Sequence, residues 1–310
     1  MIASPPVAAL IAHADAQALK SAVFYLSKDP LPYRKVNFTR PGQSKSSLEE
    51  ADDYVVGNLT SWGYAVEREP VQEQAFRCDR TKPRHHWYST PDPGDPWYTL
   101  HNVYGKKQGS TKPDEILVVV SHKDSPSWID SPGAHDNAVG TAGNLEIARL
   151  LAGEKLNHTV WFLFCNEEHT PWSSIAAANN AKSRGDRIVA VFNLDGIGAK
   201  SQEAVDAGVM TSAICYTTPE GKALADLMSQ VNDSYTIGLT QVLHQYEQPA
   251  NDDGSFIKAG YPAAIGIHGS HPYGDPNYHE AGDIPERVDI ANVRLAVQMT
   301  LATILTLDAR

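Results

Sequence analysis

The stretch EILVVVSH, residues 115–122, is a continuous apolar run of strand length that ends in a histidine. A strand that is apolar throughout is buried on both faces, which is typical of a parallel sheet covered by helices. Three further runs have the same character, namely HTVWFLFCN (158–166), RIVAVFNLD (187–195) and PAAIGIHG (262–269). These runs predict the central strands of one sheet.

Segments with helical periodicity separate the apolar runs. We expect two further strands and seven helices. The strands lie over 64–71 and 100–105, and the helices lie over 6–28, 47–62, 137–151, 172–184, 219–231, 253–259 and 289–307. This alternation predicts an α/β fold, with a largely parallel mixed central sheet and helices on both faces. No repeat or linker divides the chain, so a single domain is expected over residues 1–310.

The least regular stretch is CDRTKPRHHWYSTPDPGDPWY, residues 78–98, which contains four prolines and two tryptophans. Such a composition is typical of a long, ordered loop inserted into a domain. Two interpretations are open at this point. The loop either forms a wall of a substrate cleft or is a surface insertion without a role.

Composition argues against several classes of partner. The formal net charge is -11 and the sequence pI is about 5.5, whereas phosphate-backbone binding depends on clustered Lys and Arg. The three cysteines show no CxxC spacing, so neither a thiolate zinc site nor a disulfide framework is expected. The apolar N-terminal stretch is interrupted by His13 and Asp15 and follows no basic region, so we expect no signal peptide, and no membrane span. Nucleic acid is not an expected partner.

Polar side chains follow the apolar runs, where ligands gather in parallel sheets. They are His122 and Asp124 after the first run, Glu167 and Glu168 after the second, Asp195 after the third, His279 in the loop after the fourth, and Asp136 in the loop SPGAHDNAVG (131–140). Carboxylate and imidazole groups suit a hard or borderline cation. Two histidines and three acids are more than one tetrahedral ion needs, but two ions that share a bridging carboxylate would use all five.

The order of these motifs resembles the M28 family of metallopeptidases, the di-zinc aminopeptidases with a phosphorylase-like α/β fold of the zinc-exopeptidase type. The likeness runs from about residue 100 to residue 285. The family motifs HxDS, GAxDN, EE, NxD and YHxxxD correspond to residues 122–125, 133–137, 167–168, 193–195 and 278–283. Each motif alone is a weak signal, but five in the family's order form a strong one.

The resemblance implies a set of metal ligands for two Zn²⁺ ions. In that reading His122 and Asp195 bind opposite metals, and Glu168 and His279 complete one ion each. Asp136 would bridge both ions, through a cis peptide bond to the next residue. The expected substrate is a peptide with a free N-terminus.

The resemblance also implies roles around the ligands. Glu167 would be the general base for a water held between the two ions, and it would return the proton to the leaving amine. Tyr278 is a candidate donor to the tetrahedral oxyanion, although a tyrosine packed beside a site needs no catalytic duty. Asp124 would orient His122 through its other ring nitrogen, and Asp283 would do similar work behind His279.

Three positions depart from the family pattern. His135 stands where Asp or Asn is usual, His169 follows the glutamate pair where relatives have glycines, and Asp253 replaces a histidine. His135 and His169 are candidates for extra ligands, for outer-shell partners or for residues that line the cleft. These departures leave the expected metal set intact, but substrate preference does not carry over from relatives.

Other functions compete with an aminopeptidase. A glutaminyl cyclase, an acyltransferase of similar fold with one zinc ion, is the main enzymatic alternative. A metallocarboxypeptidase with an inserted domain is disfavoured, because predicted core elements occupy most of the stretch between Asp195 and His279. A non-catalytic metal-binding module is disfavoured because Glu167 and all five expected ligands are present. The resemblance further implies a secreted or periplasmic protein.

Overall fold

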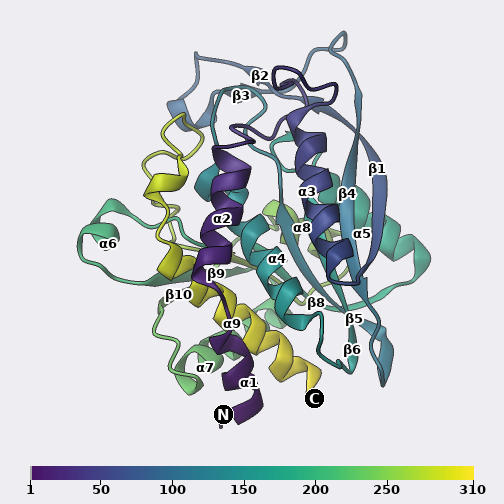
Figure 1. Cartoon of the computed structure of the whole chain (residues 1–310), viewed down its shortest axis with the longest axis vertical. Helices are drawn as coiled ribbons and strands as arrows, with labels where there is room; N and C mark the ends of the chain where they lie inside the picture. The colour runs from purple at the N-terminus through teal and green to yellow at the C-terminus, as the bar shows by residue number, and fades with distance from the viewer. Residues whose placement is uncertain (1) are drawn as a thin grey trace.

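The computed structural model describes residues 2–310, in which nine strands form one mixed sheet (Figure 1). The strand order across this sheet is β10-β9-β11-β8-β5-β6-β4-β1-β7. The strands are β1 (Ala65–Ala75), β4 (Tyr98–Lys107), β5 (Lys112–His122), β6 (His158–Cys165), β7 (His169–Thr170), β8 (Arg187–Leu194), β9 (Thr211–Tyr216), β10 (Thr240–Gln245) and β11 (Ala264–His268). A separate two-stranded sheet pairs β2 (Arg77–Cys78) with β3 (Tyr88–Ser89).

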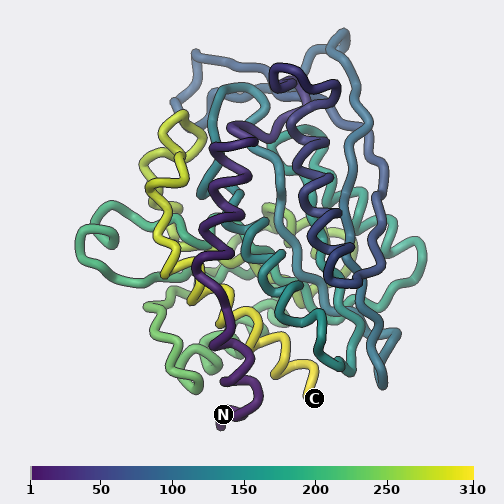
Figure 2. Tube along the Cα trace, viewed as in Figure 1, coloured from purple at the N-terminus to yellow at the C-terminus, as the bar shows by residue number. Residues whose placement is uncertain are grey.

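Helices cover both faces of the large sheet, as predicted. They are α1 (Pro5–Ala12), α2 (Ala16–Ser27), α3 (Ser47–Ser61), α4 (Val139–Leu151), α5 (Ser173–Arg184), α6 (Gln202–Asp206), α7 (Pro219–Ser234), α8 (Asn251–Lys258) and α9 (Ile290–Asp308), with short helical turns η1 (Arg84–His86), η2 (Ala134–Ala138) and η3 (Pro285–Arg287). Helices α1, α2, α3, α4, α7 and α9 share one hydrophobic core, and α5 and α8 pack over a second core on the opposite face. Helices α1 and α9 contact each other, so the two ends of the chain lie near one another (Figure 2).

The four central strands of the sheet run parallel to one another, and β9 and β10 form a second parallel pair at one edge. Strand β5 runs parallel to both β6 and β8, and β11 runs parallel to β8. Outside this group, β4 is antiparallel to β6 and β9 is antiparallel to β11. The four central strands are the four apolar runs of the sequence, and their carboxyl ends lie at one edge, where ligands are expected to gather.

One predicted helix is divided. The expected helix over 6–28 is broken into α1 and α2, because Asp15 caps the second helix by accepting hydrogen bonds from the backbone N–H groups of Gln17 and Ala18. The first turn of α2 therefore starts at Ala16, and the preceding residues leave helical geometry.

A buried arginine fastens the loops at the carboxyl edge of the sheet. Arg34 is fully buried and donates hydrogen bonds to the backbone carbonyls of Lys123, at 2.6 Å, and Gly133, at 2.8 Å. It also donates to the carbonyls of Leu26 and Pro132. Burial lowers its pKa to about 10, which leaves the guanidinium charged at neutral pH. This side chain thus joins α2 to the two loops that follow β5.

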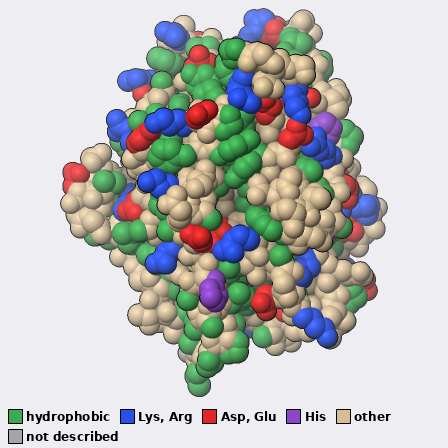
Figure 3. All heavy atoms as spheres, viewed as in Figure 1, with side chains coloured by type: hydrophobic (Ala, Val, Ile, Leu, Met, Phe, Trp, Pro, Cys, Tyr) green, Lys and Arg blue, Asp and Glu red, His purple; other side chains and the backbone are tan. Residues whose placement is uncertain are grey.

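The surface carries charges of both signs. In the view of Figure 3, Lys and Arg side chains alternate with Asp and Glu, and no broad patch of one sign covers this face. By length and composition, α9 is the one helix of the described residues that could cross a membrane, although more than half of it is buried inside the fold. The absence of a membrane span therefore stays a prediction.

Candidate metal centre

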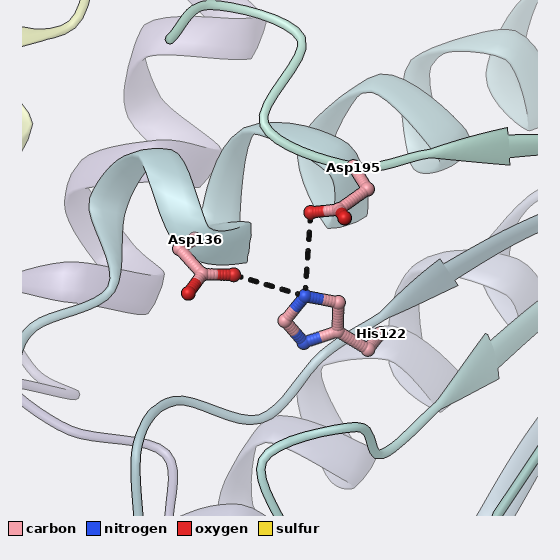
Figure 4. A group of neighbouring side chains, drawn as sticks. All are labelled: His122, Asp136 and Asp195. Carbon is pink, nitrogen blue, oxygen red and sulfur yellow. Dashed lines mark ion pairs between the residues drawn. The ribbon is translucent and has the colours of Figure 1, made fainter. Parts of the chain in front are cut away.

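The first group of potential ligands surrounds His122, the last residue of β5. Its Nε2 lies 3.1 Å from Asp136 Oδ1, in η2, and 3.5 Å from Asp195 Oδ1, directly after β8 (Figure 4). The donor atoms of these three residues all lie within 4.8 Å of one another. His122 and Asp136 are buried, and Asp195 is largely so.

The second group uses the other oxygen of Asp136. His279 Nε2 lies 3.0 Å from Asp136 Oδ2 and 3.3 Å from Glu168 Oε1. Asp136 therefore belongs to both groups, with one carboxylate oxygen directed to each. The expectation that His122 and Asp195 serve opposite metals is wrong, because the ends of the parallel strands β5 and β8 bring these two residues into one group.

The backbone around Asp136 is held by a carboxylate. The peptide bond from Asp136 to Asn137 is cis, which confirms the prediction. Asp283 accepts hydrogen bonds from the backbone N–H groups of His135, at 2.8 Å, and Asp136, at 3.1 Å. The expected position of Asp283 behind His279 is therefore wrong. Its side chain supports the loop of the shared carboxylate instead.

Asp124 accepts hydrogen bonds from both strand ends. Its Oδ1 receives the ring Nδ1–H of His122, at 3.1 Å, and the backbone N–H of Glu167, at 3.0 Å. Its Oδ2 receives the ring of His169, at 2.7 Å, and the backbone N–H of Glu168, at 2.8 Å. Burial alone would raise the pKa of Asp124, but the hydrogen bonds from His122 and His169 outweigh burial and lower it. Asp124 thus orients His122, as the sequence predicted, and fixes the glutamate pair as well.

We expect Asp124→Asn to weaken metal binding by about 10- to 100-fold, the range for partners that orient ligands. The amide retains one acceptor oxygen, but its NH2 group would face two of the four donors. The check is a competitive titration of zinc against a chelator of known affinity, with the melting temperature of the metal-free variant as the control for folding. Unchanged zinc affinity in a folded variant would contradict this role.

Buried carboxylates crowd the space beside the two groups. Burial raises the pKa of Glu167 well above its ordinary value, and the nearby Asp252 raises it further. Burial also raises the pKa of Asp252 to about 6 and that of Glu168 to about 7. One oxygen of Glu167 is buried without a hydrogen-bond partner among the described residues. Such a concentration of acids is costly unless a cation compensates it.

The donor atoms fit metal cations. A carbonyl can only accept, so the 2.9 Å contact of His279 Nδ1 with the carbonyl of His85 places the ring proton on Nδ1. Asp124 holds the proton of His122 on Nδ1 in the same way. The Nε2 atom of each ring therefore presents a lone pair to nearby carboxylate oxygens. Lone pairs of nitrogen and oxygen that face one another need a cation between them. Asp136 Oδ2 has no hydrogen-bond partner in the described part of the chain.

A model of peptidase family M28 matches residues 102–304, well over half of the chain. The chain belongs to peptidase family M28. The match covers all of the M28 motifs, from His122 at the end of β5 to Asp283 in the loop after β11.

Curated relatives of this M28 chain are named as aminopeptidases. A protein of Saccharomyces cerevisiae described as a "probable aminopeptidase" is 28% identical over 222 residues, which cover 67% of this chain and 58% of the relative. Leucine aminopeptidase 1 of Pyrenophora tritici-repentis is 27% identical over 203 residues, which cover 62% of this chain and 52% of the relative. The chain thus spans little more than half the length of the curated relatives it matches.

Solved structures of the same fold confirm the predicted fold class. LapB from Legionella pneumophila superposes with a TM-score of 0.77 and 16% identity, over 99% of this chain and 76% of that one. An aminopeptidase from Aneurinibacillus sp. strain AM-1 superposes with a TM-score of 0.71 and 14% identity, over 96% of this chain and 95% of that one. A glutaminyl cyclase from Bacteroides thetaiotaomicron superposes with a TM-score of 0.69 and 16% identity, over 94% of this chain and 97% of that one. At these identities the likeness concerns the fold alone, which aminopeptidases and a cyclase share.

The segment 78–98 lies against the candidate M28 centre, near the edge marked by β2 and β3 in Figure 1. His85 accepts from the ring of His279 through its carbonyl and donates through Nδ1 to the carbonyl of Tyr278, at 2.8 Å. The ring of Tyr88 lies 4.9 Å from that of Trp128 and 5.9 Å from that of His279. The segment also lines a cavity of about 810 Å³ that reaches His279. It is therefore a wall beside the centre and a direct partner of one ligand candidate.

The two histidines that depart from the family pattern, His135 and His169, lie outside the two donor groups that share Asp136. His169 is fully buried between Asp124 and the backbone N–H of Val36, which donates to its Nε2 at 3.2 Å. His135 Nδ1 lies 2.9 Å from Asp275 Oδ2 and 3.3 Å from Asp283 Oδ1. Burial lowers the pKa of His135, but these two acids outweigh burial and raise it to about 9. His169 is a partner of Asp124, whereas His135 forms with Asp275 and Asp283 a third, separate group of donors close enough to hold a cation.

A second, smaller cavity opens on the centre itself. Its volume is about 200 Å³, and it is lined by His122, Asp136, Glu167, Glu168, Asp195, Tyr246, Asn251, His268, Ser270, His271, Tyr273 and Tyr278. The tyrosine proposed from the sequence is therefore at the cavity, with its ring stacked on that of His279 at 3.7 Å. Sequence reasoning missed His268 and Tyr273, because no family motif contains them.

Proposed function

We propose that the protein is a metal-dependent exopeptidase that hydrolyses N-terminal residues from peptides. Its metal would be zinc, with two ions held by His122, Asp136, Glu168, Asp195 and His279. The observation that carries this proposal is the position of Asp136, whose two oxygens face two separate groups of donors, with an unpartnered carboxylate oxygen of Glu167 beside them. Aminopeptidase names among the relatives support the same reaction class.

The ions, when bound, would polarise the scissile carbonyl group and make an attacking water more acidic. The chain supplies the groups that move protons. Glu167 lines the cavity and belongs to neither donor group, so its carboxylate is free to accept the proton of the attacking water and to pass it to the leaving amine. Asp124 fixes the backbone N–H of Glu167, which holds this residue at the rim of the centre.

Tyr278 would donate a hydrogen bond to the oxyanion of the tetrahedral intermediate. Burial raises the pKa of its hydroxyl group well above the ordinary value, and Asp136 raises it further, so the hydroxyl keeps its proton at neutral pH. Stacking on His279 fixes the ring beside the centre. The free α-amino group of the peptide, a cation, would be bound among the carboxylates that line the same cavity.

The test is the release of N-terminal residues by zinc-loaded protein from a panel of aminoacyl amides and short peptides. We expect release of the first residue only, and its loss after treatment with a chelator. Formation of pyroglutamate from N-terminal glutamine, with one ion per chain and no hydrolysis, would instead assign the cyclase reaction. Absence of any product across the panel, with zinc bound, would contradict both.

A further inference from the structure

The cavity of about 200 Å³ contains more than the candidate catalytic groups. Apart from four of the five ligand candidates, Glu167 and Tyr278, it is lined by Tyr246, Asn251, His268, Ser270, His271 and Tyr273. All of these residues carry polar groups, and no aliphatic side chain lines the cavity. An aliphatic side chain of a substrate would therefore find no aliphatic partner here. This composition contrasts with the name leucine aminopeptidase that several relatives carry.

Two polar atoms in this lining are buried without a hydrogen-bond partner in the part of the chain that the structure describes. They are His268 Nε2 and Tyr273 Oη. His268 is 5% exposed. A buried polar atom without a partner is unfavourable, so atoms of this kind next to a cavity indicate a ligand that pairs with them.

The chemistry of the two atoms follows from their surroundings. His268 Nδ1 lies 2.8 Å from the carbonyl of Asp195, and a carbonyl only accepts, so Nδ1 carries the proton and Nε2 is an acceptor. Burial raises the pKa of Tyr273 well above its ordinary value, so its hydroxyl group is a donor and an acceptor. The cavity thus offers one acceptor and one hydroxyl group.

The position of Tyr273 depends on a glycine. Gly196, the residue after Asp195, has a φ of +61°, and a Cβ atom there would lie 2.6 Å from Tyr273 Oη. The missing side chain lets the tyrosine hydroxyl lie directly against the segment that carries Asp195. The ring of Tyr273 also lies 4.6 Å from that of Tyr278, which fixes it on its other side. The hydroxyl group is therefore held in one place before any ligand arrives.

We propose that this cavity accepts the side chain of the substrate's N-terminal residue and selects short, uncharged, hydrogen-bonding side chains. A carboxamide suits it best, because its NH2 group donates to His268 Nε2 and its carbonyl accepts from Tyr273 Oη. Hydroxyl side chains satisfy one of the two atoms. Aliphatic side chains of the same size leave both unpaired, which is the strong form of discrimination in enzyme pockets. This inference rests on the proposed exopeptidase function.

The experiment compares substrates of nearly equal shape. Zinc-loaded protein is assayed with amides of asparagine and leucine, and with amides of threonine and valine. We expect kcat/KM to favour asparagine over leucine by more than about tenfold, and threonine over valine by a smaller factor. Equal values, or a preference for leucine and valine, would overturn the inference.

A variant separates the pocket from the reaction. Tyr273→Phe removes one hydroxyl group without changing the ring, so we expect the asparagine-to-leucine ratio of kcat/KM to fall by about tenfold, because asparagine loses a hydrogen bond that leucine does not make. The matched control is Tyr235→Phe, whose hydroxyl group accepts from the backbone N–H of Ser4, far from the cavity in the fold. If kcat/KM fell by the same factor for the asparagine and leucine amides, Tyr273 would be assigned to catalysis or folding instead.

Binding without turnover distinguishes failure of the pocket from failure of the reaction. Free L-asparagine and free L-leucine are titrated calorimetrically into zinc-loaded Glu167→Gln protein. Tighter binding of asparagine supports the pocket even if no peptide is hydrolysed, in which case only the proposed reaction fails. Hydrolysis with tighter binding of leucine would retain the exopeptidase and overturn the pocket.

Discussion

Glu167→Gln lowers kcat by about 10³-fold, because glutamine has the same shape as glutamate but cannot take up a proton. Metal content stays at the wild-type value, since Glu167 belongs to neither of the two donor groups. KM changes little, because the backbone N–H that Asp124 holds is still present. The measurements are single-substrate kinetics and elemental analysis on the same preparation.

The matched control for this variant is Glu286→Gln, an exposed glutamate paired with Lys28 on the surface. It makes the same chemical change away from the centre, and wild-type kcat is expected. If Glu167→Gln kept more than a tenth of wild-type kcat, Glu167 would not be the general base. A loss of zinc in this variant would instead indicate that Glu167 is a ligand.

Asp136→Ala is expected to lose both metal ions, whereas Asp195→Ala loses one. Asp136 directs one oxygen to each donor group, at 3.1 Å from His122 and 3.0 Å from His279. Asp195 approaches only the His122 group. We expect the affinity for both ions to fall by more than about 100-fold in the first variant, beyond the effect typical of an outer partner. In Asp195→Ala, the affinity for only one of the two ions falls by this amount.

Elemental analysis after gel filtration at micromolar zinc measures the difference. The melting temperature of each chelated variant shows whether the chain is still folded. If Asp136→Ala and Asp195→Ala lost the same number of ions, the two groups would not share Asp136.

The sequence predicts the strand ends of this site well, for a physical reason. An apolar run such as 115–122 is buried on both faces, so its alignment in the sheet is fixed by burial alone. Its last residue, His122, is therefore carried to the sheet edge together with Asp195, the residue after β8. The cis bond at Asp136 and the support of His122 by Asp124 followed from the family motifs.

The contacts between distant loops could not be predicted. Asp283 is close to His279 in sequence, yet it supports the backbone of Asp136, because a side chain's partner depends on how two loops meet. The ring of His279 is instead hydrogen-bonded to the backbone carbonyl of His85, which lies in a segment that no motif covers. The assignment of His122 and Asp195 to opposite metals failed for the same reason, since motif order does not give spatial grouping.

Two strands of six residues, β9 and β10, also escaped prediction, as did the two-residue strands β2, β3 and β7. Strand β10 (Thr240–Gln245) is mostly exposed and lies at the sheet edge, so it lacks the apolar pattern of the central strands. Strand β9, beside it, is short and runs antiparallel to β11. The loop after β10 supplies Tyr246 to the small cavity, so this part of its polar lining was not foreseen.

The number of zinc ions per chain tests the central claim most directly. Protein purified without chelator is loaded with zinc, freed of excess metal and analysed for zinc and protein, while hydrolysis is followed during loading. The account predicts two ions per chain, with full activity only when both are present. One ion per chain, with activity complete at that point, would contradict the shared carboxylate of Asp136.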